Sequence, residues 1–172
     1  MTKQTAALLQ TLLFLIVAPG TFALLIPWWL TGWQVEAGLL HNPLIGIPLI
    51  AAGAYVLLDS FLRFAREGLG TPAPIKPPEK LVISGFYRYV RNPMYCAVLA
   101  LTLGQTLLFG SAAMLGYCAV IWLCTHCFVL FYEEPKLKSL FGADYDAYCA
   151  KVSRWLPNRS GWKSEDSPPE HP

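Results

Sequence analysis

The stretch NPMYCAVLALTLGQTLLFGSAAMLGYCAVIWLCTHCFVLFY, residues 92–132, contains no Asp, Glu, Lys or Arg. A helix needs about 20 predominantly apolar residues, each rising about 1.5 Å, to cross a hydrocarbon layer about 30 Å thick. This stretch is long enough for two crossings, and Gly110-Ser111 offers a tight turn between them. The sequence therefore predicts a membrane hairpin with spans near Met94–Phe109 and Ala112–Tyr132.

Two further stretches without Asp, Glu, Lys or Arg, Gln4–Val35 and Ala37–Leu58, precede the hairpin. They predict spans near Ala6–Leu30 and Leu44–Phe64; prolines inside the first leave open whether it is one helix or two tilted half-helices. The chain is 55% hydrophobic and 14% charged, whereas a soluble domain has about 45–50% and 25%. This composition argues against a soluble enzyme, a disordered chain and a nucleic-acid-binding protein. We expect an all-α membrane protein with about four transmembrane helices.

The basic residues are confined to alternate connections. All 13 Lys and Arg residues precede the first span, lie at the end of the second span or between it and the third, or follow the fourth. The other two connections, Thr31–Pro43 and Gly110-Ser111, contain none. Because Lys and Arg are enriched in cytoplasmic loops, the sequence predicts a multi-pass integral membrane protein whose two termini are cytoplasmic.

The segment after the fourth span has a different pattern. Between Glu133 and Leu156, apolar and aromatic residues recur mostly at three- and four-residue steps, which indicates an amphipathic helix. Gly142 leaves its continuity open, and periodicity does not decide whether it lies on lipid headgroups or folds back over the bundle. Residues 1–157 are expected to form one domain, with a proline-rich extended linker at 68–80 and a disordered tail at 158–172.

Chemically versatile residues gather where the chain enters the third span, at SGFYRYVRNPMY, residues 84–95. Pro93 suits the first turn of a helix, and Asn92 is a natural residue to precede it. The positive end of that helix, with Arg and Tyr residues beside it, favours an anionic or aromatic ligand. An interfacial anchor of Tyr and Arg is the alternative.

The pair Glu133-Glu134 directly follows the fourth span. Carboxylates at a membrane edge are costly to desolvate unless they are paired or bound to a ligand. The hairpin returns the chain beside the start of the third span, so Arg88, Arg91 and Glu133 can meet at one level. A solvated helix start is the alternative. His126 is a further candidate, because an ionisable residue inside a membrane tends to face a cavity.

The order of these elements resembles a known family. The pattern G-x-Y-R-Y-x-R-x-P-x-Y at 85–95, a membrane hairpin, and then E-E-x-x-L-x-x-x-F-G-x-x-Y-x-x-Y-x-x-x-V-x-R-W-x-P at 133–157 is similar to isoprenylcysteine carboxyl methyltransferases and phospholipid methyltransferases. The resemblance covers about residues 68–157.

The resemblance implies an integral membrane methyltransferase that uses S-adenosylmethionine on the cytoplasmic side. Carboxylates, Arg and Tyr rings match the cationic groups, the carboxylate and the adenine of that cofactor. The cofactor-binding residues that the resemblance and these chemical matches imply are Leu81, Val82, Tyr87, Asn92, Pro93, Met94, Tyr95 and Glu133. The candidate catalytic residues are Arg91 and Glu134, the candidate substrate-binding residues are His126 and Arg154, and no metal is expected.

The chain departs from the prenylcysteine-specific pattern in two places. Asn92 stands where those members commonly have His, and Val129 stands near the position of an Arg that holds the substrate carboxylate. The expected acceptor is lipophilic and enters from the bilayer, among membrane lipids. The sequence leaves open whether this acceptor is a lipid amine, a prenylated thiol or carboxylate, or a small hydrophobic metabolite. The alternatives from other classes are a non-enzymatic membrane adaptor and a small transporter.

Overall fold

The computed structural model describes residues 3–67 and 80–163, and apart from one isolated β-bridge every regular element in those ranges is a helix. The elements in chain order are α1 (Lys3–Gly20), the π-helical turn η1 (Thr21–Leu25), α2 (Ile26–Thr31), α3 (Pro43–Glu67), the 3-10 helix η2 (Gly85–Arg88), α4 (Pro93–Phe109), α5 (Ala112–Phe128), the π-helical turn η3 (Val129–Glu133) and α6 (Glu134–Lys151).

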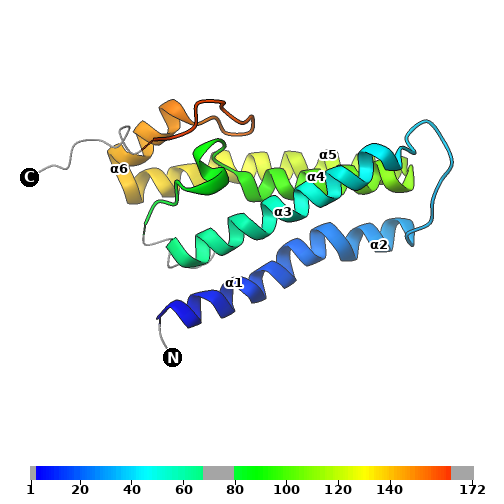
Figure 1. Cartoon of the computed structure of the whole chain (residues 1–172), viewed down its shortest axis with the longest axis horizontal. Coiled ribbons are helices and arrows are strands. Elements are labelled where there is room, and N and C mark those ends of the chain that lie inside the picture. The colour runs from blue at the N-terminus through cyan, green and yellow to red at the C-terminus, as the bar shows by residue number, and fades with distance from the viewer. Residues whose placement is uncertain (1–2, 68–79, 164–172) are drawn as a thin grey trace, which may run out of the picture.

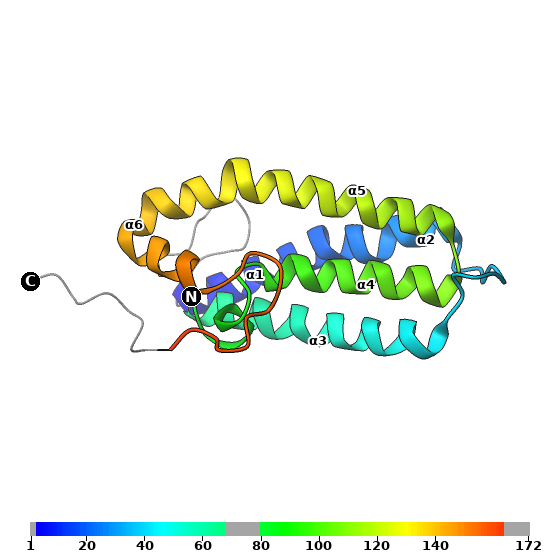
Figure 2. The same ribbon diagram turned by 90° about the horizontal axis from the view of Figure 1, so that it is seen from above.

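The protein is an all-α membrane protein. The segments Leu12–Thr31, Pro43–Glu67 and Ala112–Lys151 are long and apolar enough to cross a membrane, and α4 is a shorter apolar helix. The four predicted spans thus coincide with observed helices. One end of the bundle holds the starts of α1, α4 and α6 and the end of α3 (Figures 1 and 2). The other end holds the α2–α3 connection and the α4–α5 turn.

Helices α3 and α4 pack closely because glycines remove side chains from their interface. A Cβ atom added at Gly46 would lie 2.7 Å from the carbonyl oxygen of Gly104, and one at Gly53 would lie 2.9 Å from that of Ala97. Small residues of this kind let the backbones of membrane helices approach. The resulting contact fixes the start of α4 beside the end of α3.

The first span is one kinked helix rather than two separate half-helices. Helices α1 and α2 are joined without a break through η1, with Pro19 inside α1 and Pro27 near the start of α2. The hairpin that follows has the predicted tight turn, in which Gly110 has a positive φ of 72° that only glycine adopts readily.

The predicted amphipathic helix is bent and shorter than expected. Helix α6 ends at Lys151 rather than near Leu156, and Gly142 has non-helical angles within it (φ 50°, ψ −122°). The bend turns its second half back over the bundle, where the buried residues Tyr145 and Tyr148 form a core cluster. Of the two placements that periodicity leaves open, the structure has the helix folded over the bundle.

Residues 152–163, named here the C-terminal strap, continue from α6 and run beside residues 88–92. The N–H of Arg91 donates to the carbonyl oxygen of Ser153 at 2.9 Å, and the N–H of Trp162 donates to that of Arg88 at 2.8 Å. Because Trp162 is only 5% exposed, packed structure extends beyond the domain boundary expected at Pro157. Residues 68–79, most of the predicted linker, and 164–172 lie outside the described residues.

Candidate functional site

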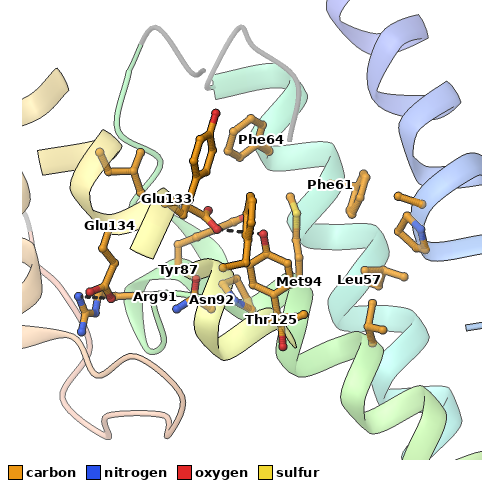
Figure 3. A pocket seen from close by; sticks show the side chains of 18 of the residues that line it. Leu57, Phe61, Phe64, Tyr87, Arg91, Asn92, Met94, Thr125, Glu133 and Glu134 are labelled. Carbon is orange, nitrogen blue, oxygen red and sulfur yellow. Dashed lines mark hydrogen bonds and ion pairs between the residues drawn. The ribbon is translucent and has the colours of Figure 1, made fainter. Parts of the chain in front are cut away.

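A cavity of about 590 Å³ lies where the starts of α4 and α6 meet, and it extends between α1, α3 and α5 (Figure 3). Its volume falls in the range of about 300–1,000 Å³ that is usual for ligand pockets. All the residues predicted to bind a cofactor or to act in catalysis line this one cavity: Leu81, Val82, Tyr87, Arg91, Asn92, Pro93, Met94, Tyr95, Glu133 and Glu134.

Tyr95 and Glu133 join the two ends of the hairpin. Tyr95 lies in the first turn of α4 and Glu133 is the last residue of η3, and the Tyr95 hydroxyl donates a hydrogen bond to Oε2 of Glu133 at 2.9 Å (Figure 3). The turn at Gly110 places the helix ends side by side, as the sequence predicts. The bond holds a carboxylate oxygen at the cavity wall.

Glu134 lies between two arginines. Its carboxylate accepts hydrogen bonds from Nε and Nη2 of Arg154 at 2.7 and 2.8 Å, and Nη1 of Arg91 lies 3.0 Å from it. The exposed fractions of the three side chains are 12% for Arg91, 18% for Glu134 and 30% for Arg154. The hydrogen bond to Glu134 raises the pKa of Arg154, so this arginine stays charged.

Arg91 has one side-chain donor without a partner among the described residues. Its Nη1 contacts both Glu134 and Sγ of Cys149, but in the described part of the chain its buried Nε has no partner. A buried donor without an acceptor costs about 1–3 kcal/mol.

Tyr87 contributes a neutral aromatic wall. It lies on η2, whose first residue, Gly85, has a positive φ of 55°. Burial raises the pKa of the Tyr87 phenol well above its usual value, so this group stays protonated. The Tyr148 hydroxyl donates to the Tyr87 carbonyl oxygen at 2.6 Å, which ties η2 to the folded-back half of α6.

Asn92 precedes α4 but does not cap it with its side chain. Its Nδ2 instead donates to the carbonyl oxygen of Arg154 at 3.1 Å. The side chain therefore holds the C-terminal strap against the start of α4. Pro93 is the first residue of that helix, where its missing N–H costs nothing.

The rest of the cavity wall is largely apolar and comes from helices that sequence reasoning did not assign to a site. The lining side chains of α1, η1, α3 and α5 are Phe14, Ala18, Pro19, Phe22, Leu57, Phe61, Phe64, Tyr117, Val120, Ile121, Cys124, Thr125 and Phe128. The lining residues of α5 recur at helical spacing. Because that helix is apolar on every side, its sequence does not indicate which face lines a cavity.

Three other predicted residues lie elsewhere. Arg88 does not reach Glu133; its Nε donates to the carbonyl oxygen of Trp162 at 2.8 Å. Among the described residues, the cavity wall includes neither His126 nor Arg154. Nδ1 of His126 accepts a hydrogen bond from Nε1 of Trp155 on the strap at 3.0 Å, so this histidine faces the strap instead of the cavity. Arg154 acts on the cavity through Glu134.

The described ranges, 3–67 and 80–163, contain no group of three or more His, Cys, Asp or Glu side chains that could hold a metal ion. The polar end of the cavity instead combines carboxylates, a guanidinium group and phenol rings. Such a set suits a ligand that carries both charges and an aromatic ring.

Residues 42–144 match the sequence model of the phospholipid methyltransferase family. Protein-S-isoprenylcysteine O-methyltransferase B of Arabidopsis thaliana is 26% identical over 133 residues, which are 76% of this chain and 60% of that protein. Probable protein-S-isoprenylcysteine O-methyltransferases of Oryza sativa subsp. indica and subsp. japonica are each 33% identical over 79 residues, 45% of this chain and 41% of theirs. The chain thus spans 60% or less of the length of these relatives.

Proposed function

The chain belongs to the phospholipid methyltransferase family, and on this basis we propose that it transfers a methyl group from S-adenosylmethionine to a lipophilic acceptor at the cytoplasmic face of a membrane. Relatives named as isoprenylcysteine O-methyltransferases support the reaction class. The observation that carries the proposal is one cavity in which the polar residues of two helix junctions, residues 84–95 and Glu133-Glu134, meet an apolar wall.

The residues at the polar end fit this cofactor. When bound, S-adenosylmethionine supplies a methyl carbon on a cationic sulfonium, and it also carries an ammonium, a carboxylate and an adenine. The Glu133 carboxylate, oriented by Tyr95, suits one of the cationic groups. The guanidinium group of Arg91, which lies in the cavity wall, suits the carboxylate. The ring of Tyr87, with Leu81 and Val82 beside it in the wall, suits the adenine.

The apolar wall has two roles in this proposal. It holds the acceptor against the polar end, and orienting two reactants at near-attack distance removes much of the entropic barrier to reaction. It also excludes water, and a water-poor site disfavours a cationic ground state more than a transition state in which the charge is dispersed. We assign no general base.

The cytoplasmic placement is supported by the charge distribution. The site lies at the end of the bundle where α1 begins, α3 ends and α6 begins (Figure 1), and the connections at that end carry the Lys and Arg residues. By the positive-inside rule, this distribution favours a cytoplasmic position for that end.

For the acceptor, we propose a lipophilic group without a carboxylate, such as a lipid amine or a thiol. Val129 is fully buried and apolar, and it stands near the position where the prenylcysteine-specific pattern has an Arg. A carboxylate there would find no cation on that turn of the helix. Incubating membranes with a radiolabelled methyl donor and separating the lipid, protein and small-molecule fractions identifies the acceptor class.

Isothermal titration of the detergent-solubilised full chain with S-adenosylmethionine tests the site. We expect Glu133→Gln and Tyr95→Phe to weaken binding about tenfold or more, because a hydrogen bond to a charged group contributes about 1.5–3 kcal/mol. The matched control is Asp146→Asn, which removes one negative charge from an exposed side chain outside the cavity. Wild-type affinity in both site variants would refute this placement. No binding by folded wild-type protein at millimolar cofactor would favour a non-enzymatic adaptor.

A further inference from the structure

The kinked first span is tied to both helices of the hairpin at one level. Pro27 has no N–H, so it cannot donate to the carbonyls four and five residues earlier, which belong to Ala23 and Phe22. The Ala23 oxygen instead accepts a hydrogen bond from Nε2 of Gln105 on α4 at 2.7 Å, and the Phe22 oxygen accepts one from the Tyr117 hydroxyl of α5 at 2.8 Å. Neighbouring helices satisfy freed carbonyls in this way in membranes.

This level is also where the cavity ends. Within the described helices, no residue of α2, no residue of α5 before Tyr117 and no residue of α4 after Val98 lines it. One turn beyond Tyr117, Met114 is fully buried. The hydrogen-bonded pair Tyr117–Phe22 therefore marks the apolar end of the cavity, and the charged residues lie at the other end.

The apolar part has a definite length. Tyr117 and Phe128 both line it and are eleven residues apart on α5, which corresponds to about 16 Å along a helix that rises 1.5 Å per residue. This is about half of the roughly 30 Å thickness of a bilayer's hydrocarbon core. The apolar part is thus about as long as the hydrocarbon chain of a lipid in a single leaflet.

Building on the proposed function, we propose that the apolar part holds a hydrocarbon chain of the acceptor and that Tyr117, held by Phe22, sets the longest chain that fits. A chain of about hexadecyl length reaches the Tyr117 ring while its head group lies at the polar end. A much longer chain meets the ring and has to leave the cavity, which draws the head group away from Arg91 and Glu133. Tyr117 is thus a specificity-determining residue that lies far from the charged groups.

Photolabelling with n-alkyl thiols that carry a diazirine at the methyl end tests this length limit. Decyl, hexadecyl and tetracosyl chains are bound to the full protein in detergent, irradiated, and located by peptide mass spectrometry. We expect the hexadecyl probe to label Tyr117 or Phe22 and the decyl probe to label α5 at least one helical turn nearer to Phe128. Labelling by the tetracosyl probe should fall on lipid-facing residues.

Two variants move the limit in opposite directions. Tyr117→Ala should shift the hexadecyl label by about one turn, toward Met114. Val120→Trp should abolish hexadecyl labelling at Tyr117 and spare decyl labelling; it keeps the test decisive if Tyr117→Ala does not fold. Leu123→Ala, on the same helix and as exposed as Val120 but outside the cavity wall, should change nothing.

Identical label positions in wild type, Tyr117→Ala and Val120→Trp would overturn the proposal, as would equal labelling of Leu123 and Tyr117 by the hexadecyl probe. The labelling requires no methyl donor. A protein that fails to bind S-adenosylmethionine but shows the expected label positions would therefore refute the proposed function alone, and the reverse result would refute the length limit alone.

Discussion

Replacing Glu134 with Gln should destabilise the protein, because it leaves two arginines facing each other. The Glu134 carboxylate lies within 2.7–3.0 Å of the guanidinium groups of Arg91 and Arg154. Removing one partner of a buried ion pair costs about 3–5 kcal/mol, because the remaining charge is left uncompensated. Since Arg154 is 30% exposed and water screens part of its charge, we expect a loss of about 2–4 kcal/mol.

Thermal unfolding in detergent, followed by tryptophan fluorescence, measures this loss. For a chain of this size Tm falls by about 2–4 °C per kcal/mol, so Glu134→Gln should lower Tm by about 4–16 °C. Asp146→Asn is the control: it breaks the exposed pair with Lys138 (3.0 Å; 54% and 63% exposed), which contributes at most about 1 kcal/mol. If both variants lowered Tm equally, Glu134 would not stabilise the site as we argue.

Two further predictions concern segments that position the site. Gly85→Ala should lower the free energy of unfolding by about 1–2 kcal/mol, because a positive φ strains an L-residue and the new Cβ would meet the side chain of Arg63. The control is Gly116→Ala, whose new Cβ meets no atom within 4 Å. Equal Tm values for the two variants would contradict this reasoning. Trp162→Ala removes the packing of the indole against Tyr148 and should destabilise the protein by about 3–5 kcal/mol. Proteolysis of the C-terminal strap should then become faster. An unchanged cleavage rate would show that the indole does not hold the strap in place.

The spans and the meeting of the two junctions could be predicted because both follow from local features. A charge-free run of the length of residues 92–132 has few alternatives to two crossings. A turn as short as Gly110-Ser111 then brings the far ends of its helices together, whatever their rotation. The contact of Tyr95 with Glu133 needed only that adjacency, and so did the approach of Arg91 to Glu134.

The apolar wall could not be predicted, because its position depends on helix rotation. In the first span, Phe14 and Ala18 line the cavity while Leu13 and Val17 are exposed, and no difference in polarity separates the two faces. Likewise, a single Trp162 in a polar and proline-containing tail gives no periodic signal, so its docking against the bundle was missed.

The bend at Gly142 decides which arginine completes the site. Arg88 belongs to the first junction, yet its side chain donates to the strap carbonyl of Trp162. The bend reverses the chain and returns Arg154 to Glu134, twenty residues earlier, while the Arg154 carbonyl accepts a bond from Asn92, sixty-two residues away. One residue of the strap thus contacts both junctions. The charged end of the cavity therefore depends on long-range contacts that exist only once the strap has docked.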